Sequence, residues 1–298
     1  ETYMKSAVAA WNWAEAAMLD PEAGLGPALS KLNLSLVDRQ AAVTRSRNAF
    51  LNGRLWAAGS LFRLTGEAAY DTVVRARYGA GWFGLAGMAG DGMWEYINAK
   101  GADLKIQTDV RFRIVEATDR YMVQPQLAKV SYRSMKHGGA PLWWGEGGAP
   151  NQDELSQVIR AYLISHSKEY LKMMQDASAH ILGANQVGKS LTIGLGKRWP
   201  VAPLHADSIA SGEAPPNGIT IYGWAQQQFT NYGWIWWSPW AALPQSDPTR
   251  SVDPHWRSLP IYEYLVEYPT NIMSNEYTVN QTIATTAAMW IFLDGYQK

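Results

Sequence analysis

The chain has 298 residues, 47% of them hydrophobic, and its 26 Lys and Arg side chains balance 26 Asp and Glu side chains. This balance provides no basic stripe for a nucleic-acid backbone, and the absence of cysteine excludes disulfides and thiolate metal sites. The apolar runs are shorter than the roughly 18 residues of a membrane-spanning helix, which argues against a membrane span.

Helical periodicity dominates the chain. Apolar residues recur at steps of three and four, which predicts helices separated by short turns. One such turn, at Thr65-Gly66-Glu67, joins two helices in the pattern of an αα-hairpin. Residues 82–99 are ambiguous because of their glycines, but Met88, Trp94 and Ile97 favour a helix. The other predicted helices cover residues 3–18, 41–64, 67–78, 109–121, 152–165, 168–182 and 277–293.

Residues 182–276 break this pattern, because they are rich in Gly, Pro and Trp and mostly irregular. Short extended pieces occur at residues 191–195 and 219–222. A long irregular segment in a compact protein is typically a set of functional loops. Together with the repeated helix pairs, it predicts an all-α protein, an α/α barrel or solenoid, with its function on loops at one end.

The aromatic composition favours a sugar ligand. The chain has 15 Trp and 15 Tyr but only 6 Phe, and the first two combine a flat apolar face with a polar edge that suits polyhydroxyl ligands. A Trp-rich core is the alternative interpretation. The candidate sugar contacts are Trp143 and Trp144, in a loop before a predicted helix, and Tyr222, Trp224 and Trp236 in the irregular segment.

Residues 183–190 match the phosphate-loop pattern G-x-x-x-x-G-K-S. That motif requires a strand before it and a helix after it, because the helix N-terminus helps to bind the phosphates. Here a predicted helix precedes the loop and an extended, Gly-containing segment follows it. The sequence therefore disfavours a nucleotide site at Lys189.

Three motifs in order resemble glycoside hydrolase family 9. The run Ile181-Leu182-Gly183-Ala184-Asn185 with a later Ser190 is similar to the family's "L-L-G-x-N" stretch. Pro203-Leu204-His205 resembles its "P-H-H-R" motif, and Asn275-Glu276 before an apolar helix resembles the "N-E" that carries its general acid. The hairpin around Thr65-Gly66-Glu67 is similar to a recurring family hairpin, so the resemblance spans most of the chain.

The resemblance implies an (α/α)6 barrel that hydrolyses a β-1,4-linked glucan or related oligosaccharide with inversion. It implies Glu276 as the general acid and His205 as a donor to a sugar hydroxyl. An inverting enzyme also needs a carboxylate base roughly 6.5–9.5 Å away, so that a water fits between the two carboxyl groups. Glu263 and Glu267 are alternative acids, and a plain helix N-terminal carboxylate is the structural alternative for Glu276.

The family's "D-A-G-D" motif, which carries the base, has no full counterpart here. Residues 88–91 share three of its letters, but Asp91 falls in a predicted helix and in the wrong order. We therefore interpret residues 1–298 as the C-terminal portion of one α/α-barrel catalytic domain. The N-terminal helices with the base would lie outside this chain, as a separate chain or a removed segment.

Two further departures concern specificity. The family arginine after the histidine is Ala206 here, and Asp207 and Ser208 are predicted to replace it with different substrate hydrogen bonds. The family's Asp and Tyr at the fourth and fifth positions after the acid are Asn280 and Gln281. These changes favour an exo-acting or oligosaccharide-specific member, or another sugar such as glucosamine.

The missing base and arginine leave a second hypothesis open, a non-catalytic carbohydrate-binding α/α-barrel protein. Catalysis of the implied kind requires no cofactor, and the histidines lack metal-ligand spacing. Loop carboxylates such as Asp247 and Asp253 are the candidates for a structural calcium ion, without a dense acidic calcium loop. The resemblance implies a β-linked oligo- or polysaccharide as the partner and a secreted or periplasmic location.

Overall fold

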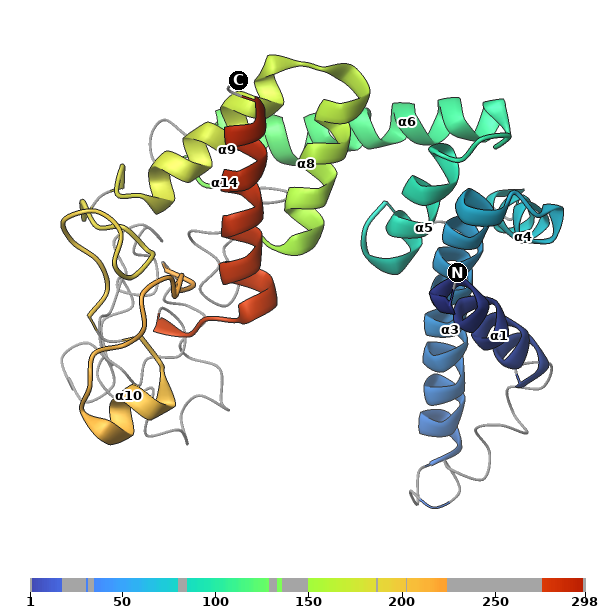
Figure 1. Cartoon of the computed structure of the whole chain (residues 1–298), viewed down its shortest axis with the longest axis horizontal. Coiled ribbons are helices and arrows are strands. Elements are labelled where there is room, and N and C mark those ends of the chain that lie inside the picture. The colour runs from blue at the N-terminus through green and yellow to red at the C-terminus, as the bar shows by residue number, and fades with distance from the viewer. Residues whose placement is uncertain are drawn as a thin grey trace. The chain divides into compact units, whose positions relative to one another are not determined.

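The computed structural model describes residues 2–17, 31, 35–79, 85–128, 133–135, 150–185, 187–201, 203–223 and 275–296. They belong to two compact units, Glu1–Ile114 and Val115–Lys298. Helices dominate both units (Figure 1), as the all-α prediction required. Within the described residues, β pairing is limited to an isolated antiparallel bridge between Thr192 and Thr220, which joins the two predicted extended pieces.

The first unit contains α1 (Thr2–Ala17), α3 (Leu36–Thr65), α4 (Ala68–Gly79) and α5 (Gly87–Ile97), and α6 (Leu104–Thr118) crosses its boundary. Helix α3 begins five residues before the predicted start because Ser35 caps it: the Ser35 hydroxyl accepts the backbone N–H of Asp38 at 3.1 Å. It ends at Gly66, whose φ of 73° lies in the left-handed region that favours glycine. The predicted hairpin turn is confirmed.

Helices α3 and α5 pack with their backbones in contact at glycines. A Cβ atom on Gly92 of α5 would lie 2.6 Å from the Cα atom of Trp56 in α3, and a Cβ on Gly59 of α3 would meet the carbonyl oxygen of Gly92. Gly92, one of the glycines that made residues 82–99 ambiguous, is therefore a packing residue of a helix. Leu55, Ala58, Met93, Tyr96 and Ile97 are buried around this contact.

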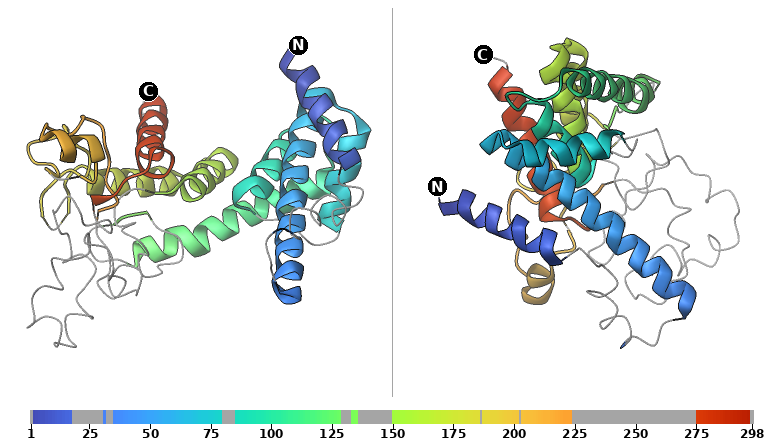
Figure 2. Two further views of the ribbon diagram at one scale, coloured as in Figure 1. Left: turned by 90° about the horizontal axis from the view of Figure 1, so that it is seen from below. Right: turned by 90° about the vertical axis from the view of Figure 1, so that its right-hand side faces the viewer.

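Helix α1 lies against α3, as Figure 2 shows. The Arg54 guanidinium forms two hydrogen bonds to the Glu15 carboxylate, at 2.5 and 2.7 Å, and also lies 5.7 Å from the Trp11 ring centroid. Trp11 in turn packs edge-on against Tyr70 of α4, with ring centroids 5.3 Å apart. Arg54 of α3 and Tyr70 of α4 thus hold α1 through its Glu15 and Trp11 side chains.

The second unit is built on α8 (Gln152–Ser165), α9 (Lys168–Ile181) and α14 (Ala284–Tyr296), which lie side by side in Figure 1. It also contains η1 (Asp119–Val123), α7 (Gln124–Leu127), α10 (Ala206–Ser211) and η8 (Val279–Ile283). Polar side chains cap α8 and α9: Asn151 forms a capping box with Glu154, and Ser167 accepts the N–H of Glu169.

Polar and aromatic contacts fix the register of these three helices. The Trp290 indole N–H of α14 donates to Ser178 Oγ of α9 at 2.8 Å, and Tyr162 of α8 packs on Tyr296 with centroids 4.9 Å apart. The Tyr170 hydroxyl of α9 donates to Asp119 at 2.7 Å, and burial raises its pKa well above the usual value. Among the helices that the structure describes, none has the length and apolar character needed to cross a membrane.

Candidate functional site

Backbone hydrogen bonds bring three distant segments together around Glu276. The N–H of Leu204 donates to the carbonyl oxygen of Asn275, and the N–H of Tyr222 donates to that of Glu276, both at 2.8 Å. Asn275 is fully buried, whereas Glu276 is only partly buried. The stretch Asn275-Glu276 is therefore bound both by the loop before α10 and by the segment that follows the β-bridge. The Glu276 side chain remains partly exposed.

His205 caps α10, a helix that the sequence did not predict. The backbone N–H of Ser208 donates to His205 Nδ1 at 3.2 Å, and the Ser208 hydroxyl lies 2.8 Å from the same nitrogen. The helix ends at Gly212, with φ of 74°. The partly buried imidazole is thus anchored through one of its two nitrogens.

Tyr277, the residue after the predicted acid, completes the arrangement around the histidine. Its ring lies nearly parallel to that of His205, at an angle of 24° with centroids 6.4 Å apart. Burial raises the pKa of the Tyr277 hydroxyl, and the Asp207 carboxylate raises it further. The predicted residues His205, Asp207 and Glu276 are therefore neighbours of one tyrosine that was not singled out from the sequence.

Gln281, the fifth residue after Glu276, is held by two hydroxyl groups. The Tyr222 hydroxyl donates to Gln281 Oε1 at 3.2 Å, and Thr278 Oγ1 donates to the same oxygen at 3.4 Å. Thr278 Oγ1 also accepts the backbone N–H of Gln281, which caps η8. Since both hydroxyls address the carbonyl oxygen, the amide end of Gln281 is the end left for other partners. Tyr222 itself is buried, with 6% of its surface exposed.

The phosphate-like loop at residues 183–190 is filled by its own asparagine. Asn185 Nδ2 donates to the carbonyl oxygens of His180 and Lys189, at 2.8 and 2.7 Å. Its Oδ1 accepts the backbone N–H groups of Val187 and Lys189, both at 3.3 Å. These are the donors that a phosphate would need, and an extended segment rather than a helix follows. The loop geometry therefore does not suit a nucleotide.

Several predicted residues lie outside the part of the chain that the structure describes. They are Trp143, Trp144, Trp224 and Trp236, the carboxylates Asp247 and Asp253, and the alternative acids Glu263 and Glu267. Their roles stay predictions. Among the described residues, no cluster of three or more His, Asp or Glu side chains is placed to hold a metal ion.

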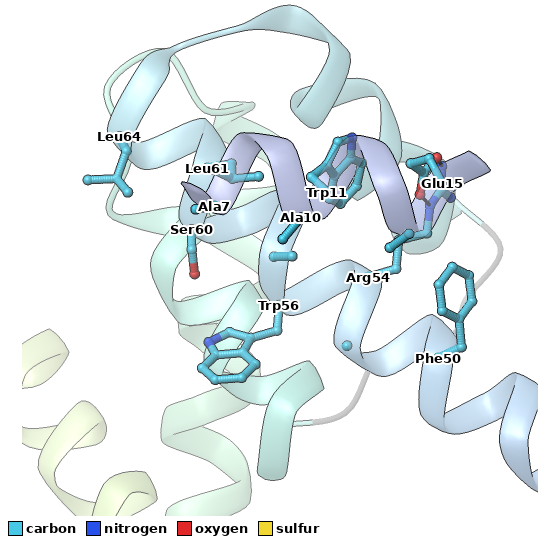
Figure 3. A pocket seen from close by; sticks show the side chains of 13 residues that line it. Ala7, Ala10, Trp11, Glu15, Phe50, Arg54, Trp56, Ser60, Leu61 and Leu64 are labelled. Carbon is cyan, nitrogen blue, oxygen red and sulfur yellow. Dashed lines mark hydrogen bonds and ion pairs between the residues drawn. The ribbon is translucent and has the colours of Figure 1, made fainter. Parts of the chain in front are cut away.

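Asp91 and a nearby cavity belong to the first unit. Asp91 lies in α5, as predicted, between Gly90 and Gly92, both of which are in close backbone contact with neighbouring residues. A cavity of about 490 Å³ opens between α1 and α3 (Figure 3). Its walls are mostly apolar, and its carboxylate, Glu15, is paired with Arg54. The cavity therefore lacks the acid and base groups of a hydrolytic site.

Comparison with known proteins gives consistent results. The family model "Glycosyl hydrolase family 9" matches residues 1–242, a range that includes His205, Asp207 and Tyr222 but ends before Glu276. Endoglucanase D of Acetivibrio thermocellus is 25% identical over 227 residues, which are 70% of this chain and 33% of that protein. The chain thus spans about a third of the length of the curated relatives that it matches.

Solved structures of similar fold are also family 9 enzymes. A metagenome-derived glycoside hydrolase family 9 endoglucanase has a TM-score of 0.58 at 20% identity, covering 83% of this chain and 40% of that one. AaCel9A in complex with cellobiose-like isofagomine has a TM-score of 0.52 at 18% identity, covering 82% and 43%. The fold of this chain is therefore that of part of an (α/α)6 barrel.

Proposed function

The chain belongs to glycosyl hydrolase family 9, and we propose on that premise that it is part of an enzyme hydrolysing a β-1,4-linked glucan or related oligosaccharide. The reaction is hydrolysis with inversion, and Glu276 is its general acid. The observation that supports this proposal best is the convergence of the segments around Glu276. Leu204 and Tyr222 bind the carbonyl oxygens of Asn275 and Glu276, so the acid stands beside His205 and Tyr277.

In this mechanism Glu276 gives its proton to the glycosidic oxygen as the bond to the leaving sugar breaks. A carboxylate base on the opposite side removes a proton from the attacking water, and the two carboxyl groups stand roughly 6.5–9.5 Å apart. The base belongs to a part of the barrel beyond residues 1–298, which form the C-terminal portion of the catalytic domain. The partners of the chain are thus that remaining part and the β-linked sugar.

The neighbouring side chains are assigned to substrate binding. His205 and Asp207 bind sugar hydroxyls, His205 as a donor and the exposed Asp207 carboxylate as an acceptor. Tyr222 is buried, so it contributes to substrate binding indirectly. Its hydroxyl binds Gln281 Oε1 and orients the Gln281 amide toward the substrate. Trp143, Trp144, Trp224 and Trp236 are proposed as stacking platforms for sugar rings. The enzyme acts outside the cytoplasm, where its polymeric substrates are found, and needs no catalytic cofactor.

The proposal is tested by hydrolysis of β-linked gluco-, xylo- and chito-oligosaccharides by the full gene product. Glu276→Gln removes the proton donor while keeping the shape of the side chain, so we expect kcat to fall by about 100- to 10,000-fold with substrate binding retained. Product release is measured by chromatography, and binding by calorimetry.

Glu213→Gln is the matched control, because Glu213 is an exposed carboxylate after α10. We expect it to hydrolyse the same sugars at the wild-type rate. If the wild-type protein binds a sugar but releases no product, the hydrolase assignment fails and the chain is a carbohydrate-binding barrel. If Glu276→Gln retains full turnover, another residue is the acid.

A further inference from the structure

His205 is held at one ring nitrogen by two groups of the same residue. The Ser208 backbone N–H donates to Nδ1 at 3.2 Å, and the Ser208 hydroxyl lies 2.8 Å from that nitrogen. A backbone N–H is only a donor, so Nδ1 must offer its lone pair. In a neutral imidazole the proton is then on Nε2, and the hydroxyl acts as a second donor to Nδ1.

Other contacts hold the backbone at His205. The carbonyl oxygen of Pro203 accepts the His205 N–H at 2.8 Å, and the Ile209 N–H donates to the His205 carbonyl oxygen at 3.0 Å. These bonds fix the backbone, and the Tyr277 ring lies nearly parallel to the imidazole, at 24° with centroids 6.4 Å apart. Among the described residues Nε2 has no hydrogen-bond partner.

We propose that Ser208 is a positioning residue that selects the Nε2–H tautomer of His205 and aims that N–H at the substrate. The histidine then presents a donor and not an acceptor, which suits the lone pairs of a sugar hydroxyl oxygen. This inference rests on the proposed function for its substrate. The tautomer itself follows from contacts within the protein and does not require turnover.

The tautomer is measured on the full gene product labelled with 15N-histidine, by long-range 1H–15N correlation spectra. The chain has five histidines, and the His205 signals are assigned by their loss in His205→Asn, since asparagine is itself a good N-cap and preserves α10. We expect a protonated Nε2 and an unprotonated Nδ1 for His205. A protonated Nδ1 overturns the proposal, whether or not the protein hydrolyses any sugar.

The role of the hydroxyl is measured with Ser208→Ala and Ser208→Thr. Loss of one neutral hydrogen bond corresponds to a change of roughly three- to tenfold. We therefore expect Ser208→Ala to lower kcat/KM by about that factor and to shift the Nδ1 signal, and Ser208→Thr to restore both. Ser211→Ala is the control, because Ser211 Oγ bonds to the Asp207 carbonyl oxygen in the same helix.

The control variant should leave both readouts at their wild-type values. If Ser208→Ala also leaves the His205 signals and kcat/KM unchanged, the hydroxyl does not position the ring and the proposal fails. If the wild-type protein shows no hydrolysis, the proposed function fails separately, and the 15N signals of wild type, Ser208→Ala and Ser208→Thr still decide the positioning role.

Discussion

The two compact units hold their backbones by opposite means. In the first unit, α3 and α5 approach because Gly59 and Gly92 lack side chains, and backbone atoms touch where any Cβ would collide. In the second unit, the turns around Asn185 and His205 exist because polar side chains reach into them and bind the backbone. In the first unit, helix packing therefore depends on positions that have no Cβ atom. In the second unit, the turns depend on side chains that form hydrogen bonds to the backbone.

Gly92→Ala is expected to have the largest effect on stability. The added Cβ would lie 2.6 Å from the Trp56 Cα atom, which is backbone and cannot rotate away. We expect a loss of about 3 kcal/mol in the free energy of unfolding, measured by chemical denaturation. Gly53→Ala in α3, the helix that α5 contacts, is the control, since nothing lies within 4 Å of its Cβ position. It should be neutral or stabilising by up to about 1 kcal/mol. Equal effects of the two substitutions would contradict the close-packing explanation.

Asn185→Asp tests the second unit with almost no change in shape. A carboxylate still accepts the N–H groups of Val187 and Lys189, but it cannot donate to the carbonyl oxygens of His180 and Lys189. We expect a loss of about 2 to 3 kcal/mol, because buried acceptors then face each other. Thermal unfolding gives the measurement. A variant as stable as the wild type would mean that the loop does not depend on this carboxamide.

Alkaline pH should weaken the first unit through Tyr96. Burial raises the pKa of this hydroxyl to about 12, and its hydrogen bond to Asp71 adds to the shift. Between about pH 10 and 12 the unfolded chain loses the proton and the folded chain keeps it, so stability falls as pH rises through this window. The expected loss is about 2 kcal/mol. Tyr96→Phe should flatten this part of the stability curve, and an unchanged slope would exclude Tyr96 as its source.

Tyr222→Phe should produce the smallest effect. It removes the 3.2 Å hydrogen bond to Gln281 Oε1 and leaves the buried ring in place. We expect about 1 kcal/mol or less in stability and a rise in KM with kcat retained, since Thr278 still binds Gln281. Steady-state kinetics on an oligosaccharide give the result. A fall in kcat alone would place Tyr222 closer to the chemistry than we propose.

The helices were largely predictable because their signals are local. The apolar periodicity within residues 152–165 and 168–182 predicted α8 and α9, and Gly66 indicated the hairpin turn. Helix α6 starts at Leu104, five residues before the predicted start, because Asp103 Oδ1 accepts the N–H groups of Lys105 and Ile106. That cap was readable in the sequence, and the apolar pattern alone did not find it.

The sequence singled out individual residues of the candidate site, but not the backbone contacts that bring their segments together. Motif order singled out His205 and Glu276, but the backbone bonds from Leu204 to Asn275 and from Tyr222 to Glu276 join residues 54 to 71 positions apart. The spacing of apolar residues along the sequence contains no information about such long-range backbone hydrogen bonds. Helix α10 was missed because it has six residues and its cap is a histidine, which is not among the usual capping residues.

The wide turn η8 changes how positions after Glu276 are counted. The N–H of Ile283 reaches back five residues to the carbonyl oxygen of Thr278, at 3.2 Å, so this turn contains one residue more than an α-turn. The turn Val279–Ile283 leads directly into α14, whose Met289 and Leu293 are buried. In a related chain with an ordinary α-turn here, the residue at the same distance after Glu276 would lie at a different place in space, so Gln281 has to be aligned by its contacts.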